Sequence, residues 1–207
     1  MRVLAADDAG AAVAASALQA GEVVAIPTDT VYGLAARVDC LEAVRTLFEL
    51  KGRPDDVAIA VLAASGAQAR ELAGEWSASA ERLAAAWWPG ALTMVVPARV
   101  LLASLGGSGA TVGVRVPGSA WVRDLCSQTG PLAVTSANGH GEAPMTSAGA
   151  IAEAWPNGSP RFSIVLDGGP CEGMPSTVVD CSQDPPQCLR EGALTWARIV
   201  SSLEHGL

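Results

Sequence analysis

Histidines are scarce in this chain of 207 residues. It contains only two histidines, His140 and His205, and its five cysteines form no Cys-x-x-Cys pair. Zinc sites draw on Cys and His ligands at short, recurring spacings, and no such spacing occurs here. The sequence therefore predicts no zinc site and favours unpaired thiols in a reducing compartment.

Long apolar runs, a basic excess and a phosphate-binding glycine loop are also missing. The chain turns acidic at Asp7 and Asp8, and no segment approaches the roughly 20 apolar residues of a membrane span, so we expect a cytoplasmic protein without a membrane anchor. The net charge of -8 argues against tight nucleic-acid binding, because that affinity comes mainly from Lys and Arg neutralising phosphates. The absence of a Gly-x-x-x-x-Gly-Lys-Ser/Thr sequence argues against a P-loop nucleotide site.

Hydrophobic residues make up 50% of the chain, enough for the core of one α/β domain over residues 1–207. Their periodicity and the turn residues predict helices at 8–20, 41–50, 65–72, 77–87, 119–128, 146–154 and 194–203. They predict strands at 22–27, 58–63, 91–96, 111–116, 131–135, 163–166, 177–180 and 187–190. Because the strands outnumber those of a pure βαβ array, we expect a twisted, mixed parallel and antiparallel sheet with flanking helices.

Polar side chains follow two of the predicted strands directly. Thr28, Asp29 and Thr30 come after the first strand, and Ser136 and Asn138 come after the strand that ends at 135. Ligands of open α/β sheets gather at strand ends, which favours a site for a nucleotide and a small polar acid. The alternative is a pair of turns in which these side chains satisfy local backbone groups, and the residues alone leave both interpretations open.

Two cations, Lys51 and Arg53, stand at the exit of the predicted helix 41–50. They either complement the negative end of the helix macrodipole or hold a triphosphate, with Arg53 making forked contacts and Lys51 acting as a point charge. The intervening Gly52 and the following Pro54 fix the backbone, which favours the second interpretation.

Arg115 shares one face of its predicted strand with Thr111, because side chains alternate along a strand. An arginine among apolar residues usually has a carboxylate or phosphate partner, and Asp29, Asp180 or a bound ligand are the candidates. An exposed strand face is the alternative. Ser176 and Arg190 are likewise compatible with an ordinary strand start and a turn.

Six segments, taken in order, resemble motifs of the YrdC/Sua5/TsaC family. They are Pro-Thr-Asp-Thr-Val-Tyr-Gly-Leu (27–34), Lys-Gly-Arg-Pro (51–54), Pro-Gly-Ala-Leu-Thr (89–93), Val-Gly-Val-Arg-Val-Pro (112–117), Ser-Ala-Asn (136–138) and Pro-Ser-Thr-Val-Val-Asp (175–180). The resemblance covers nearly the whole chain, and Lys-x-Arg followed by Ser-x-Asn is far more specific than any single segment.

The resemblance implies a YrdC-like fold and an L-threonylcarbamoyladenylate synthase. Such enzymes condense L-threonine, bicarbonate and ATP into threonylcarbamoyl-AMP and pyrophosphate, with Mg²⁺ accompanying ATP. A separate transferase then modifies an adenosine of tRNAs, so the synthase itself need not bind tRNA tightly.

The resemblance also implies roles for individual residues. Threonine would be surrounded by Thr30, Arg115, Ser136 and Ser176, with Arg115 pairing its carboxylate. ATP would be held by Lys51, Arg53, Thr111, Asn138, Thr146 and Arg190. Lys51, Arg53, Ser136 and Asn138 would form the catalytic group, which acts by positioning and charge dispersal, and no side chain is implied as a metal ligand.

The chain departs from the family pattern after Arg53. A polar residue, Pro-Leu and a histidine are common there, whereas this chain has Val57, Ala58, Ile59 and Leu62, so contacts by Val57 and Leu62 run through the backbone or are absent. The chain resembles the short, single-domain form rather than members with a second domain. The rival hypothesis is an RNA- or ribosome-binding factor that shares the fold without synthase activity; the acidic charge and the Lys-x-Arg and Ser-x-Asn segments count against it.

Overall fold

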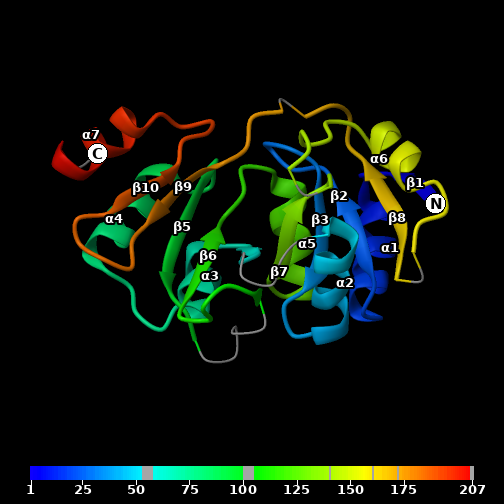
Figure 1. Ribbon diagram of the computed structural model, residues 1–207, viewed down its shortest axis with the longest axis horizontal. Coiled ribbons are helices and arrows are strands. Elements are labelled where there is room, and N and C mark those ends of the chain that lie inside the picture. Colours follow the sequence, from blue (N-terminus) through cyan, green and yellow to red (C-terminus); the bar gives the residue numbers. More distant parts are fainter. Residues whose placement is uncertain (53–57, 100–104, 140, 160, 172, 206–207) are drawn as a thin grey trace.

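The computed structural model describes residues 1–52, 58–99, 105–139, 141–159, 161–171 and 173–205, and these form one continuous sheet flanked by helices (Figure 1). The strands are β1 (Arg2–Ala5), β2 (Val23–Ile26), β3 (Gly33–Arg37), β4 (Ala60–Leu62), β5 (Leu92–Pro97), β6 (Thr111–Arg115), β7 (Leu132–Ser136), β8 (Phe162–Asp167), β9 (Thr177–Asp180) and β10 (Gln187–Arg190). The helices are α1 (Asp8–Gln19), α2 (Leu41–Lys51), α3 (Gly66–Leu72), α4 (Ala78–Trp87), α5 (Ala120–Thr129), α6 (Ala148–Ala154) and α7 (Trp196–His205). Within these residues, no helix is long and apolar enough to cross a bilayer.

The strand order in the sheet is β1-β8-β2-β3-β7-β4-β6-β5-β9-β10. The pairs β1–β8, β2–β8, β4–β6 and β5–β9 are parallel, and the pairs β2–β3, β3–β7, β4–β7, β5–β6 and β9–β10 are antiparallel. This arrangement confirms the expected mixed sheet. Neighbours in the sheet are often distant in the sequence, so segments far apart along the chain meet at its centre.

Helices cover both faces of the half of the sheet that contains β2, β3 and β8 (Figure 1). Leu18 of α1 and Leu125 of α5 bury against Ile26 on one face. Leu47 of α2 belongs to the core cluster that includes Ala25, the neighbour of Ile26 on β2. Adjacent strand residues point to opposite faces, so α2 lies on the other side of the sheet from α1 and α5.

The end of α2 is fixed by a left-handed glycine. Gly52 has a φ of 58°, and its N–H donates to the carbonyl oxygens of Phe48 and Glu49. Glycine adopts this conformation without a Cβ penalty and is the usual residue one position past a helix. The chain therefore leaves α2 directly after Lys51, whose long side chain extends from the last turn.

Two strands, β1 and β3, were not predicted. β1 is mostly exposed, so it has no alternation of apolar residues to reveal it, and it is held by parallel pairing with β8. β3 begins at Gly33, and a Cβ there would lie 2.5 Å from Cγ1 of Val134 on β7. In the sequence, the small residues of this segment suggest a turn. In the structure they allow β3 to fit between β2 and β7.

Two buried thiols give the fold a predicted sensitivity to high pH. Burial raises the pKa of Cys126 and Cys181 from an ordinary value of 9.0 to about 12. The unfolded chain therefore loses these protons first, and the free energy of unfolding should be unaffected below pH 9.0 and fall between that pH and about 12. The expected slope is at most roughly 1.4 kcal/mol per pH unit for each thiol.

Urea unfolding at about pH 8 and about pH 10 measures this slope. The variant with Cys126→Ala and Cys181→Ala should lose most of the dependence, even though it starts from a lower stability. An alkaline slope of the same size in both proteins would contradict the assignment to these thiols.

Candidate active site

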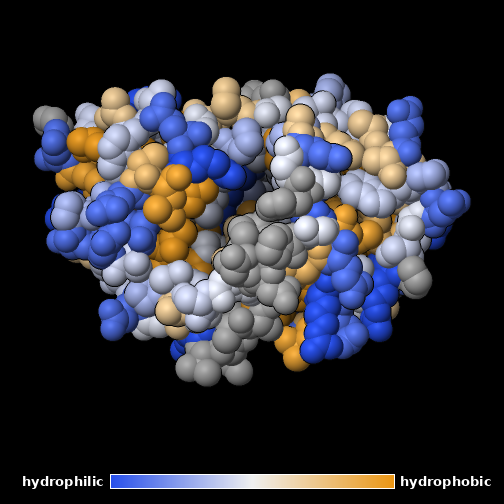
Figure 2. Space-filling view, in the orientation of Figure 1, coloured by the Kyte–Doolittle hydropathy of each residue, from blue (hydrophilic) through white to orange (hydrophobic). Residues whose placement is uncertain are grey.

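A cavity of about 500 Å³ lies where β4, β5, β6, β7 and β9 meet. Figure 2 shows the molecule hollowed near the centre of this face, with hydrophilic surface above the hollow and hydrophobic surface to its left. The lining is completed by four further segments, which lie before β3, at the end of α2, after β7 and before β9. Seven of the predicted site residues line this one cavity: Thr30, Lys51, Arg115, Ser136, Asn138, Ser176 and Arg190.

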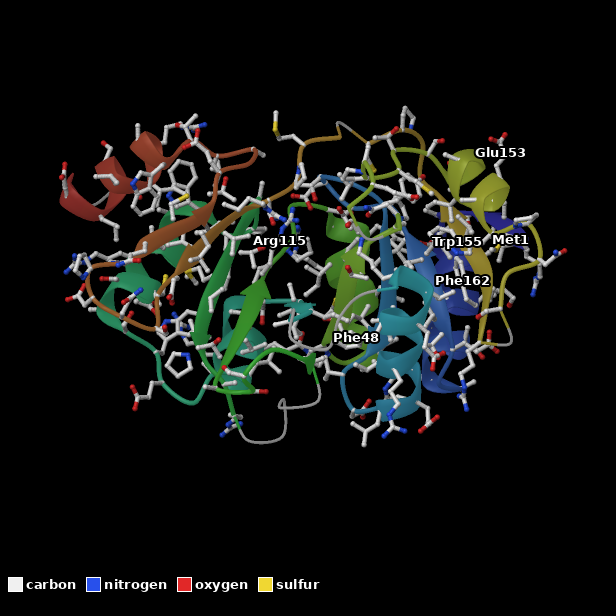
Figure 3. The ribbon with its side chains drawn as sticks, viewed as in Figure 1. Met1, Phe48, Arg115, Glu153, Trp155 and Phe162 are labelled. Atoms are coloured by element: carbon white, nitrogen blue, oxygen red, sulfur yellow. The ribbon has the colours of Figure 1, made fainter. Side chains whose placement is uncertain are left out.

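Arg115 ends β6 with its guanidinium in the cavity wall and only 5% of the residue exposed. Its Nε donates to the carbonyl oxygen of Gly90 at 2.9 Å, and its Nη1 donates to Oγ1 of Thr30 at 2.9 Å. Its Nη2 lies 2.8 Å from Oδ1 of Asp29. Figure 3 shows the side chain near the middle of the molecule, between the β5–β6 and β2–β3 parts of the sheet.

The contact between Arg115 and Asp29 is an ion pair without a well-aligned hydrogen bond. Nη2 and Oδ1 are close, yet among the described residues neither atom has a hydrogen-bond partner of acceptable geometry. Burial lowers the pKa of the Arg115 guanidinium, and the charge of Asp29 acts in the opposite direction. Arginine nevertheless stays protonated at neutral pH, so a buried cation lies in the wall of the cavity.

Lys51 also lines the cavity, with only 5% of the residue exposed. Its Nζ donates to Oγ and the carbonyl oxygen of Ser136, each at 2.9 Å, and it contacts Oδ1 and the carbonyl oxygen of Asn138 at 2.8 and 3.2 Å. Nδ2 of Asn138 in turn donates to the carbonyl oxygens of Gly139 and Glu142. The ammonium thus fixes the turn after β7 and stabilises its oxygens in one orientation.

A third polar group joins β5, β9 and β10. Oγ1 of Thr93 and Oγ of Ser176 lie 2.8 Å apart, and both residues are buried. Arg190 donates from Nη2 to the carbonyl oxygen of Ser176 at 2.8 Å. Burial lowers the pKa of the Arg190 guanidinium. Arginine nevertheless stays protonated at neutral pH, so Arg190 is charged as well.

Positive charge dominates the described lining. Lys51, Arg115 and Arg190 are set against one carboxylate, that of Glu142, which accepts from the N–H of Gly139 at 3.0 Å. Among the described residues, no group of three or more His, Cys, Asp or Glu is placed to hold a metal ion. Cations and hydroxyls around a concave site are suited to a ligand that carries phosphate and carboxylate groups.

Comparisons with known proteins identify the family of this chain. The family model for Sua5, YciO and YrdC proteins, described as "Telomere recombination", matches residues 16–192. A Mycobacterium tuberculosis relative is 36% identical over 192 residues, which cover 92% of this chain and 87% of the relative. The chain belongs to the Sua5/YciO/YrdC family.

Other members of the family are longer. The Bacillus subtilis threonylcarbamoyl-AMP synthase is 36% identical over 200 residues, which cover 95% of this chain and 57% of that protein. The structure of Pyrococcus abyssi Sua5 complexed with L-threonine superposes with a TM-score of 0.92 at 34% identity and covers 99% of this chain and 61% of that one. The chain thus spans a little over half the length of these two relatives. The family match confirms the family that the motifs predicted, and the structural superposition confirms the expected YrdC-like fold.

Three of the residues predicted from the family motifs, Arg53, Thr111 and Thr146, are not among the described lining residues. Thr111 begins β6 opposite Pro97, and Thr146 is exposed just before α6. The structure places both outside the lining of the cavity, and their roles stay predictions. Arg53 and Val57 lie outside the described residues, as does His140, whereas Leu62 does line the cavity.

Sequence reasoning missed Thr93 and Glu142 as lining residues. Thr93 closes the segment Pro-Gly-Ala-Leu-Thr, which contributed to the family resemblance without being assigned a role. Its contact with Ser176 depends on the parallel pairing of β5 with β9, which joins segments 83 residues apart. Glu142 is held by a local turn, and an isolated glutamate in a polar loop carries no recognisable signal.

Proposed function

We propose that this chain is a threonylcarbamoyl-AMP synthase that condenses L-threonine, bicarbonate and ATP and releases pyrophosphate. The observation that carries the proposal is the convergence of three cations and several hydroxyls on one cavity of about 500 Å³, a volume suited to a nucleotide beside an amino acid. The names of the family relatives support the same activity.

Threonine is assigned to the side of the cavity that contains Arg115. The buried guanidinium of Arg115 lines this side, and arginine is the side chain best suited to a carboxylate. Thr30 and Ser176 place hydroxyls close to Arg115 and Arg190 and would accept or donate to the amine and hydroxyl of the amino acid. The solved complex of Pyrococcus abyssi Sua5 with L-threonine supports threonine as a ligand of this chain.

The nucleotide is assigned to the side that contains Lys51 and Asn138, next to Ser136, which the family motifs assign to threonine. Lys51 adds positive charge there while it orients Oγ of Ser136 and the amide of Asn138. Such fixed dipoles stabilise charge that develops in a transition state without reorganising. Arg53, Thr111, Thr146 and Arg190 belong to the proposed nucleotide site through the family motifs.

The reaction needs positioning rather than a covalent enzyme intermediate. The amine of threonine attacks the carbon of bicarbonate, and the adduct loses water to give a carbamate. A carbamate oxygen then displaces pyrophosphate from the α-phosphorus of ATP. Holding these atoms in line removes much of the entropic barrier, and the surrounding cations disperse the charge of the leaving pyrophosphate.

Magnesium would enter as part of the ATP complex, because Mg²⁺ is commonly held by substrate phosphates, waters and one or two carboxylates. The described lining offers Glu142 alone as a carboxylate, which fits that mode rather than a dedicated protein site. We further propose a single cytoplasmic domain that passes its product to a separate tRNA-modifying transferase and does not bind nucleic acid tightly.

The test combines the purified chain with ATP, bicarbonate, L-threonine and magnesium. We expect pyrophosphate and threonylcarbamoyl-AMP, with no product when any substrate is omitted. L-valine is the matched control because it replaces the hydroxyl of threonine with a methyl group, and a site that hydrogen-bonds the hydroxyl should reject it. Tight RNA binding without product would favour the rival binding factor and overturn the proposal.

A further inference from the structure

Two buried hydroxyl groups meet in the wall of the cavity, one from β5 and one from the residue before β9. Oγ1 of Thr93 lies 2.8 Å from Oγ of Ser176, and only 5% of Thr93 and 8% of Ser176 are exposed. Both residues line the cavity. Within the described part of the chain, Ser176 is the only hydrogen-bond partner of the Thr93 hydroxyl. This hydroxyl therefore holds Ser176 rather than a group of its own strand.

The sheet fixes where the Thr93 hydroxyl points. β5 and β9 pair in parallel, and the N–H of Thr177 donates to the carbonyl oxygen of Ala91 at 3.0 Å. The methyl group of Thr93 packs over Gly113 of β6, where an added Cβ would lie 3.3 Å from Cγ2. Gly113 thus leaves space for this methyl group. Because threonine is branched at Cβ, the position of the methyl group also sets that of the hydroxyl.

Ser176 is held a second time by Arg190 of β10. The guanidinium donates from Nε and Nη2 to the carbonyl oxygen of Ser176, at 3.2 and 2.8 Å, and Nη2 also lies 3.4 Å from Oγ. A hydroxyl can accept two hydrogen bonds and donate one, whereas arginine can only donate. If Thr93 donates as well, both acceptor positions of the Ser176 hydroxyl are taken, and its own proton remains for a ligand.

We infer that Thr93 is a positioning residue for the proposed threonine site: its hydroxyl donates to Oγ of Ser176, and the Ser176 proton then points to an oxygen of the substrate. The inference rests on the proposed function. In the opposite arrangement Ser176 would donate to Thr93 and present a lone pair to the ligand. The guanidinium groups of Arg115 and Arg190 in the same cavity favour an anionic ligand, which needs donors, so the charges favour the first arrangement.

Thr93→Val keeps the shape of the side chain and removes its hydroxyl. L-threonine should bind roughly tenfold more weakly, as expected for one lost hydrogen bond. KM for L-threonine should rise roughly tenfold with kcat within about twofold, because a contact that holds substrate and transition state equally changes KM alone. ATP affinity should stay within about twofold of wild type. Thr93→Ser keeps the hydroxyl and should bind L-threonine within about threefold of wild type.

Calorimetric titrations with L-threonine and with magnesium ATP test the inference, together with the kinetics of pyrophosphate release and a thermal-unfolding check of the fold. The double-mutant cycle uses Ser176→Ala: if Thr93 acts through Ser176, Thr93→Val should change threonine affinity less than about twofold in that background. Thr129→Val is the matched control, since the Thr129 hydroxyl is buried but donates to the carbonyl oxygen of Leu125 in α5, outside the cavity lining. If Thr93→Val does not fold, Thr93→Ala takes its place.

Wild-type threonine affinity in Thr93→Val would overturn the role of Thr93 and leave the synthase proposal standing. Equal losses of ATP and threonine affinity, or a loss that persists undiminished in the Ser176→Ala background, would mean that Thr93 only supports the cavity wall, which also overturns the inference. A wild-type protein that binds L-threonine neither alone nor with ATP would overturn the synthase proposal and the role of Thr93 together.

Discussion

Replacing Arg115 with alanine is expected to lower kcat/KM for L-threonine by roughly 100- to 1000-fold, the largest loss that we predict for the threonine side of the cavity. The substrate carboxylate would lose its buried cation, and Oγ1 of Thr30 would lose the donor that orients it. Steady-state pyrophosphate release at varied L-threonine measures the effect.

The substitution also strands the Asp29 carboxylate, so activity must be separated from stability. Removing one partner of a fully buried ion pair costs about 3–5 kcal/mol, and the cost should be smaller here because the Asp29 side chain is 22% exposed; removing both partners relieves much of it. The double variant with Asp29→Ala and Arg115→Ala should therefore regain thermal stability relative to Arg115→Ala without regaining turnover. Recovery of turnover in the double variant would mean that Arg115 is structural only.

Arg123→Ala is the matched control. Arg123 lies on α5 and donates to the carbonyl oxygens of Pro117 and Gly118, outside the cavity lining. Its loss should leave kcat/KM for threonine near the wild-type value. Arg115→Lys should behave like alanine rather than like wild type, because an ammonium cannot make the three separate contacts of the planar guanidinium.

The helices and most strands were predictable because their signals are local. The helix predicted at 41–50 is α2, and the strand predicted at 177–180 is β9 with the same bounds. β3 was not predictable, since its glycine and alanines suit a turn as well as a strand buried between two others. The decisive information was the space available beside β7, which no local pattern contains.

The site was predictable only in part, because its contacts also join segments that are distant in the sequence. Each polar segment alone was compatible with a turn or a helix end, and only the order of six motifs joined them. The structure explains why they belong together, because Lys51 contacts Ser136 across 85 residues and Arg115 contacts Thr30 across 85 residues. Thr93 became visible only when the pairing of β5 with β9 placed it beside Ser176 in the cavity.

Replacing Lys51 with methionine is expected to reduce turnover by roughly a thousandfold and to destabilise the fold by about 3 kcal/mol. Methionine keeps most of the side-chain volume but offers no proton to the oxygens of Ser136 and Asn138 that the ammonium contacts at 2.8–3.2 Å. The turn after β7 would then be free to reorient, and the positive charge beside the proposed phosphate site would be lost. In a chain of this size the melting temperature should fall by about 6–12 °C.

The sequence makes this prediction unusually easy to check, because Lys51 is the only lysine in the chain. A sample labelled with ¹⁵N-lysine should give one side-chain ammonium signal, protected from solvent exchange by its hydrogen bonds and shifted by ATP. Lys51→Arg is the informative companion, since it keeps a cation but cannot direct three protons from one nitrogen toward the same turn. If position 51 acts only through charge, the Lys51→Arg variant will keep most of its turnover. The contacts indicate instead that Lys51 acts by holding Ser136 and Asn138, and the Lys51→Arg variant should then lose turnover almost as completely as the Lys51→Met variant. A solvent-exposed, freely exchanging ammonium in the wild type would contradict both the buried position and the role assigned to it.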